Sequence, residues 1–278
     1  MTSINISPMT VSYALVPGEI YEGYVTVTNP STSTEDVTIT AKAMPFSIVE
    51  DSTDYEMDFG TISDLTMITD WIDIPEPTRT ISPGTHADIA YTISVPSDAH
   101  GGGQYAAINV GLSPSTYVGA NTDVMEAISV SQLIYASVAG DIVSSGEVRE
   151  NTIGLISFDQ RITANSTISS TGNVHVSAQS KLEIYPLFSD ANVFIDEERT
   201  GVKAVTILPG QTFALTNSWD GPMFGIYRVV HTVQVADAIS TNAKYVLLCP
   251  IWAFIGFLAL ILLAVVGIVV RVGRRKRY

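Results

Sequence analysis

The chain has 278 residues, a length typical of about two domains, and its 46% of hydrophobic residues against 15% of charged ones excludes a disordered protein. Residues 1–245 carry nine basic residues against all 28 acidic ones, a net charge of −19 that excludes nucleic acid and anionic lipid headgroups as electrostatic ligands. The single cysteine, Cys249, excludes an intrachain disulfide, and a surface protein without cystines is more typical of bacteria or archaea than of eukaryotes.

The first half of the chain is predicted to form β-strands, because apolar and polar residues alternate there with a period of two. The apolar positions of the two clearest stretches are Val37, Ile39, Ala41 and Ala43, and then Ala87, Ile89, Tyr91, Ile93 and Val95. Pro17-Gly18 and Pro83-Gly84 each precede a strand, as expected of type II turns, in which proline sets the first central φ and glycine accepts the second.

The second half repeats both signals. Its alternating apolar positions are Val174, Val176, Ala178, Leu182 and Ile184, and then Tyr227, Val229, Val233 and Val235, with His231 in the same register. Pro209-Gly210 again precedes a strand. Many short strands separated by turns favour a sandwich over a parallel sheet. We therefore expect an all-β fold of two tandem Ig-like β-sandwich domains, residues 1–140 and 141–244, followed by one C-terminal transmembrane helix.

The predicted helix covers residues 245–271. The run from Val246 to Val270 has no charged residue, and as a helix it would be about 37 Å long, enough to cross roughly 30 Å of hydrocarbon with some tilt. Tyr245 and Trp252 suit the aromatic layer at its outer end, and Pro250 is tolerated in a first turn. A buried core helix would need an amphipathic pattern, which this run lacks.

The tail, residues 272–278, is basic and predicts the orientation of the chain. The cations that flank the helix are Arg271, Arg274, Arg275, Lys276 and Arg277. The positive-inside rule places them in the cytoplasm and residues 1–245 outside the cell membrane. Residues 1–5 lack the basic and apolar regions of a signal peptide. Either such a signal has been removed or the chain is tail-anchored, and the basic tail favours the first alternative.

Several motifs follow one another through residues 8–138. The motifs, in order, are Val16-Pro17-Gly18-Glu19 before Tyr24-Val25-Thr26-Val27-Thr28-Asn29-Pro30, Trp71-Ile72, Ile81-Ser82-Pro83-Gly84, Tyr91-Thr92-Ile93-Ser94-Val95-Pro96 and Gly101-Gly102-Gly103-Gln104-Tyr105-Ala106-Ala107-Ile108. Their order and spacing, more than any one of them, resemble the first domain of the WxL-interacting proteins of Gram-positive cell surfaces. The resemblance implies two Ig-like domains, of which the first binds peptidoglycan and the second binds a partner or host protein.

The glycine run is the first candidate binding site. Gly102, Gly103, Gln104 and Tyr105 form a stretch in which glycine would let a ligand approach the backbone while the tyrosine ring offers a stacking surface. The structural alternative is a wide turn or bulge at the start of a strand. A phosphate loop is excluded, because no Lys-Ser/Thr pair or helix follows.

Two further sites are considered. Asp51, Asp54, Glu56 and Asp58 gather carboxylates that suit calcium, although their spacing matches no EF-hand and a solvated acidic loop is the better explanation. Trp219 lies in the turn-rich stretch Asn217-Ser218-Trp219-Asp220-Gly221-Pro222 and is expected to be a surface aromatic that stacks on a ligand, whereas Trp71 is expected in the core.

The sequence offers no catalytic motif. The four histidines lack metal-ligand spacing, and no serine lies in a G-x-S-x-G or S-x-x-K motif. No enzymatic activity and no cofactor are expected. The function expected instead is that of a membrane-anchored binding or scaffold protein that attaches non-covalently to peptidoglycan or to another envelope protein. The alternative is an anchored structural subunit or assembly chaperone of a surface fibre, which would offer an unpaired edge strand rather than an aromatic groove. A surface hydrolase is the least favoured alternative.

Overall fold

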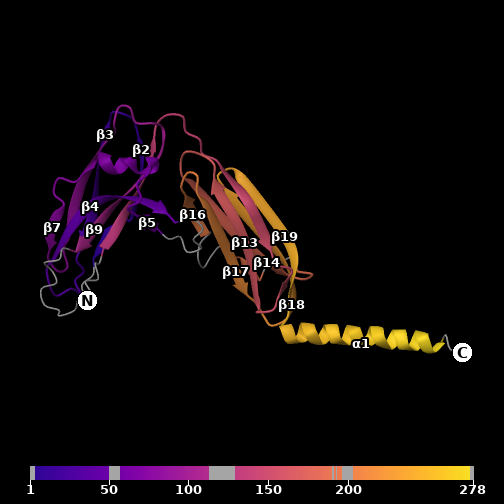
Figure 1. Ribbon diagram of the computed structural model, residues 1–278. Coiled ribbons are helices and arrows are strands. Elements are labelled where there is room, and N and C mark those ends of the chain that lie inside the picture. The colour runs from indigo at the N-terminus through magenta and orange to yellow at the C-terminus, as the bar shows by residue number, and fades with distance from the viewer. Residues whose placement is uncertain are drawn as a thin grey trace. The chain divides into compact units, whose positions relative to one another are not determined.

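The computed structural model describes residues 4–49, 57–112, 129–189, 191, 193–195 and 203–275. These residues form β-strands, one 3-10 helix and one C-terminal α-helix (Figure 1). The expected all-β fold with a C-terminal apolar helix is thereby confirmed. The chain divides into two compact units: unit 1 comprises Met1–Ser145, Ser170–Val176 and Ile207–Gln211, and unit 2 comprises Gly146–Ser169, Ser177–Thr206 and Thr212–Tyr278.

Unit 1 contains two sheets. The first has the strand order β1-β3-β8-β6, with bounds Asn5–Ser7, Ile20–Thr28, His86–Ser94 and Ile72–Asp73. The second has the order β2-β10-β9-β4-β5, with bounds Thr10–Leu15, Ser129–Val138, Gly102–Leu112, Val37–Ile48 and Met57–Phe59, and β7 (Thr78–Ile81) also pairs with β4.

The main core of unit 1 lies on the faces that the alternation predicts. Val37, Ile39 and Ala41 of β4 are buried in one cluster with Ile89, Tyr91 and Ile93 of β8, together with Val95, which follows that strand. The turns before β3 and β8 contain Gly18 and Gly84 at φ of +86° and +76°, which glycine adopts without steric cost. The predicted strands and their turns are confirmed at these positions.

The first strand of unit 1 changes sheets. β1 pairs with β3 in one sheet, and β2 pairs in parallel with β10 in the other. Where the chain crosses over, the buried Gln132 side chain donates from Nε2 to the carbonyl oxygens of Pro8 (3.0 Å) and Tyr24 (3.3 Å). Its Oε1 accepts a hydrogen bond from the hydroxyl of Tyr91 at 3.1 Å. This amide satisfies backbone groups that would otherwise be buried without partners.

One 3-10 helix, η1 (Asp64–Trp71), lies between β5 and β6. Ser63 caps it, because the serine hydroxyl accepts from the backbone of Leu65 while Thr66 accepts from the backbone of Ser63. Ile68 points into the main core and is fully buried. The cap and this single apolar anchor fix the helix beside β9.

Unit 2 also contains two sheets. One has the order β11-β13-β17, with bounds Gly146–Ile153, Arg161–Ser170 and Thr212–Asp220. The other has the order β12-β19-β18-β14-β15, with bounds Ile156–Ser157, Ala238–Leu248, Gly225–Val235, Val176–Pro186 and Phe194–Ile195, and β16 (Lys203–Ile207) pairs with β14. The apolar positions predicted in β14 and β18 are buried, as expected.

His231 is a buried polar residue within unit 2. Its Nδ1 lies 2.7 Å from Oδ1 of Asn151, and its Nε2 lies 3.2 Å from Oδ1 of Asn217. Asn217 in turn accepts from the hydroxyl of Ser180 at 2.7 Å. Burial lowers the pKa of His231 to about 4, because the interior disfavours the charged imidazolium. The ring therefore belongs to the core of unit 2.

The C-terminal helix α1 runs from Ile251 to Arg275, and its first 18 residues are long and apolar enough to cross a membrane. The predicted start at residue 245 is wrong. Residues up to Leu248 belong to β19, where Val246 and Leu248 are buried in the core of unit 2. An uncharged run cannot distinguish a buried strand from the start of an apolar helix, and in this chain the change comes at Pro250.

Candidate functional site: a pocket in unit 1

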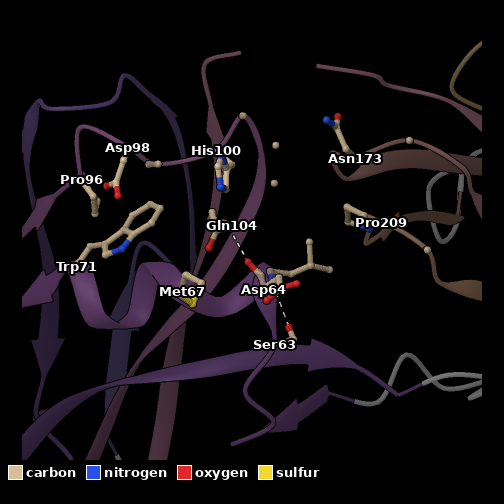
Figure 2. Close-up of a pocket in the computed structure, with 17 residues that line it drawn as sticks. Ser63, Asp64, Met67, Trp71, Pro96, Asp98, His100, Gln104, Asn173 and Pro209 are labelled. Atoms are coloured by element: carbon tan, nitrogen blue, oxygen red, sulfur yellow. Dashed lines mark hydrogen bonds between the residues drawn. The ribbon is translucent and has the colours of Figure 1, made fainter. Parts of the chain in front are cut away.

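Unit 1 contains a pocket of about 850 Å³. Its walls come from η1, from the connection between β8 and β9, from the first residues of β9 and from the segments Ser170–Val176 and Ile207–Gln211. Figure 2 shows residues from these segments around one opening, with Met67 and Trp71 on η1, His100 above, and Asn173 and Pro209 on the opposite side.

An apolar ledge forms one wall of the pocket. We define it as Met67, Trp71 and Pro96, all of which line the opening. The Met67 side chain is 46% exposed. Trp71 is half-buried, because part of the indole packs against the main core, as expected, while the rest faces the pocket. An exposed methionine beside an indole ring provides a flat apolar surface that is typical of ligand sites.

Acidic groups stand at the rim. Asp64 opens η1, and Asp98 lies in the connection between β8 and β9, close to Trp71 in Figure 2. Both residues are exposed, and within the described residues neither carboxylate makes a hydrogen bond or ion pair. The rim therefore presents two unpartnered anionic acceptors, and His100 also lines the pocket.

Gln104, which was predicted from the sequence to lie in the binding site, lines the pocket but holds the protein together. Its Oε1 accepts from the backbone N–H of Ile68 at 3.1 Å, and its Nε2 donates to the carbonyl oxygen of Asp64 at 2.8 Å. The amide thus ties η1 to β9 and keeps the ledge and Asp64 in place.

Gly102 and Gly103 also line the pocket, and neighbouring groups of unit 1 explain why they are glycines: the backbone of Asn173 lies against Gly102 and the ring of Tyr105 lies against Gly103. Gly102 has φ of +142°, and a Cβ there would lie 3.2 Å from the carbonyl oxygen of Asn173. The N–H of Gly103 donates to that same oxygen at 2.7 Å. A Cβ on Gly101 would lie 2.8 Å from Cα of Gly140. The close approach expected of a ligand is made instead by neighbouring segments of unit 1.

Tyr105 is not a ligand-stacking residue, and that expectation is corrected. Its ring is fully buried against Phe46, Tyr135 and Leu208, on the face of β9 opposite Gln104. Its hydroxyl lies 3.3 Å from Nδ1 of His175, and burial raises its pKa above the usual range. A ring enclosed in this second cluster has no face to offer to a sugar or a peptide.

Trp219 is corrected for a related reason. It lies on β17, which continues to Asp220, and not in a loop. The indole is half-buried, packs against the core of unit 2 and makes an edge contact with the ring of Tyr227 at 5.1 Å between centroids. The turn-forming residues Gly221-Pro222 come only after the strand has ended.

The remaining predicted residues are placed as follows. Asp51, Asp54 and Glu56 lie outside the described residues, and Asp58 on β5 accepts a hydrogen bond from the hydroxyl of Thr61. Within the described residues, no group of three or more histidine, cysteine or acidic side chains is arranged to hold a metal ion. Arg271, Arg274 and Arg275 lie in the last turns of α1, with Arg271 exposed, whereas Lys276 and Arg277 lie outside the described residues.

The residues that build the rim and the ledge were not singled out from the sequence. The signal that identifies them is Ser63-Asp64-Leu65-Thr66, a capping pattern that indicates a short helix within a β domain. Such a helix lies outside the sheets, so its polar face and its Met67 and Trp71 side chains are available for a site.

No protein-family model matches this sequence, and no curated protein matches it. Among solved structures, the chain is similar to the class 5 fimbriae chaperone CfaA at 12% identity and a TM-score of 0.40, covering 87% of this chain and 99% of that one. It is similar to the E. coli chaperone DraB at 13% identity and a TM-score of 0.40, covering 88% and 97%. It is similar to the YadV chaperone at 11% identity and a TM-score of 0.42, covering 87% and 99%. Likenesses this distant carry no argument about the function of this chain.

Proposed function

We propose that this chain is a membrane-anchored cell-surface protein that binds peptidoglycan non-covalently through the pocket of unit 1. Anchoring is supported by α1, in which none of the residues Ile251–Ile268 is fully buried. The basic residues at its end favour a cytoplasmic tail and an outward ectodomain. The resemblance of residues 8–138 to the WxL-interacting proteins agrees with this proposal.

The observation that carries the proposal is the combination of the apolar ledge with the unpartnered carboxylates of Asp64 and Asp98. A sugar ring has an apolar face that stacks on an indole and hydroxyl groups that donate to carboxylates. The peptide stems of peptidoglycan add ammonium groups, which suit the same acceptors. A volume of about 850 Å³ lies within the usual range for small-molecule sites.

The charge of the ectodomain determines how such binding would respond to salt. Residues 1–245 carry a net charge of −19, so long-range attraction to an anionic wall polymer is excluded. Short-range stacking and hydrogen bonds must supply the affinity. Added salt should therefore leave binding unchanged, or strengthen it by screening the repulsion.

The test is sedimentation of the detergent-solubilised full chain with insoluble peptidoglycan. The variant Asp64→Asn with Asp98→Asn removes both rim charges at exposed positions, and we expect affinity to fall about tenfold or more, since hydrogen bonds to charged groups contribute roughly 1.5–3 kcal/mol each. Asp70→Asn is the matched control, because Asp70 is exposed on the same helix but does not line the pocket. Equal sedimentation of the two variants, or none by the parent protein, would remove peptidoglycan as the ligand of this pocket.

A second candidate function, an anchored subunit or assembly chaperone of a surface fibre, is favoured by a different observation. β12 pairs with β19 only at Leu247 and Leu248. Since the N–H of Leu247 points toward β12, alternation directs the backbone groups of Thr241, Ala243 and Tyr245 to the same side, where no described strand pairs with them. An unpaired edge of this kind suits addition of a strand from a protein partner.

Ala243→Pro tests this second candidate. Proline removes one outward N–H and leaves the ladder with β18 intact, so melting should be unchanged while capture of a fibre subunit is lost. Capture of the subunit by both the parent and the proline variant would mean that the β19 edge is not used.

A further inference from the structure

One end of unit 2 is unusually apolar. Three connections meet there: the segment around β12, the residues that follow β14 and the turn between β17 and β18. Their register shows that they share an end, because Ile156 pairs with Leu247, Gly225 pairs with Leu248 and the N–H of Leu187 donates to the carbonyl oxygen of Ile226. We call this the loop end of unit 2, and define its exposed apolar residues as Leu155, Ile156, Phe158, Phe188, Met223 and Phe224.

These apolar side chains are more exposed than is usual for side chains of their size. Phe188 is 98% exposed, Leu155 is 63% exposed and Phe224 is 51% exposed. Phe188 also has φ of +66°, a conformation that is costly for a bulky side chain. Several exposed apolar side chains gathered at one end of a domain mark a contact with another apolar surface.

The loop end touches the first turn of α1. The ring of Phe158 lies 5.3 Å from that of Phe254, and the ring of Phe224 lies 6.0 Å from that of Trp252. The apolar span of α1 begins at Ile251, so Trp252 and Phe254 occupy its outermost turn. Where α1 enters a bilayer, the loop end is at the same depth.

The charge of the loop end differs from that of the chain. Its described residues include two acids, Asp159 and Asp220, and two bases, Arg161 and Arg228, and the sequence adds one more acid, Asp190, two residues after Phe188. Arg161 pairs with Asp220 at 2.7 Å, and Arg228 stacks over the ring of Tyr185. Because each described acid is matched by a base, the described part of this end repels anionic headgroups less than the rest of the ectodomain does.

We propose that the loop end of unit 2 is a lipid-binding surface, whose phenylalanine, leucine and methionine side chains enter the interfacial layer of the membrane around α1. This inference rests on the anchoring part of the proposed function. Lipid is the occupant that the contacts favour, because whatever covers these loops must lie directly beside the helix at the point where it leaves the bilayer. Aromatic and aliphatic side chains at this depth are stabilised by burial in the headgroup and acyl boundary.

The inference is tested with single-cysteine variants of the full chain in nanodiscs that contain lipids with a quencher near the headgroup. Cys249→Ser provides a cysteine-free background, and Phe188→Cys and Phe224→Cys place an environment-sensitive fluorophore at the loop end. Phe188 is almost fully exposed, so its replacement leaves the core untouched. Asp237→Cys is the matched control, because Asp237 is exposed in the turn between β18 and β19, at the opposite end of the β18–β19 hairpin.

We expect lipid quenching to be several-fold stronger at positions 188 and 224 than at position 237. Equal and weak quenching at all three positions, in protein that co-elutes with the nanodiscs, would overturn the lipid contact and leave the anchor intact. Labels that resist both the lipid quencher and aqueous iodide would show that protein covers the loop end, which also overturns it. A chain that does not enter nanodiscs would instead contradict the proposed membrane anchoring.

Discussion

Gln104→Leu removes the amide that joins η1 to β9 while keeping a side chain of similar size. The buried N–H of Ile68 would lose its acceptor, which costs about 1–3 kcal/mol, and the partly exposed carbonyl of Asp64 would lose a donor that water can replace, at about 0.5–1.5 kcal/mol. We therefore expect the free energy of unfolding to fall by roughly 2–4 kcal/mol. Because η1 carries Met67 and Trp71 of the apolar ledge and one rim carboxylate, binding at the pocket should weaken as well.

The assay is urea unfolding combined with hydrogen exchange at the amide of Ile68. Gln179→Leu serves as the control, since Gln179 is an exposed glutamine on β14 and its replacement should change stability by less than about 0.5 kcal/mol. If Gln104→Leu unfolds at the parent urea concentration and the Ile68 amide stays protected, the Gln104 side chain does not hold η1. Its role in positioning the ledge and Asp64 would then be refuted.

Three other predictions concern stability. Ile93→Ala should cost about 2–5 kcal/mol, whereas Thr92→Ala on the other face of β8 should cost far less, and equal shifts in melting temperature would mean that the register is wrong. His231 has a folded pKa of about 4 against the usual 6.5, so the unfolded state binds more protons than the folded state between these two pH values. The stabilisation from the neutral ring should be complete above about pH 6.5 and should fall as the pH is lowered toward 4. In thermal melts, a His231→Asn variant should show a melting temperature that depends less on pH. Truncation after residue 250 should leave a folded ectodomain. Truncation after residue 245 removes Val246 and Leu248 from the core of unit 2 and should lower the melting temperature of that unit. Equal melting temperatures of the two truncated proteins would place both residues outside that core.

The strands could be predicted from the sequence because apolar and polar residues alternate along a strand whose sheet has one face in the core and the other in solvent. It failed on β9, where the residues from Gly102 to Ala107 are all buried because both faces of the strand are covered. Nothing in the residue pattern shows that Tyr105 meets a second aromatic cluster, since Phe46 and Tyr135 come from distant strands. The end of β19 was missed for a similar reason, because Val246 and Leu248 are as apolar as the helix that follows.

The pocket depends on side chains that no local pattern connects. Asp64 and Asp98 lie on different connections, and only the packing of η1 on β9 brings them to one rim. Asp64 lies at the start of a helix and Asp98 lies in a turn, and in both places an acidic residue is usually just solvated. The sequence does identify the neighbouring glycines, because three in succession are rare. It does not show that the backbone of Asn173 lies against Gly102 or that the ring of Tyr105 lies against Gly103.

The sheet-switching first strand of unit 1 has a kinetic consequence. Gln132 and Pro8, which meet at the crossover, are 124 residues apart in the chain. The hydrogen bond between them therefore cannot form until the ribosome has synthesised the chain as far as β10. Closing a loop of this length costs conformational entropy before the contact stabilises the fold. Unit 1 therefore has a topology that is typical of slow folding. During that interval the edges of β3 and β10 are both unpaired, and the two sheets are completed in a final step when β1 pairs with β3 and β2 pairs with β10. Loss of the first fifteen residues should therefore leave a unit that collapses but stays open along one side, prone to pairing with its neighbours.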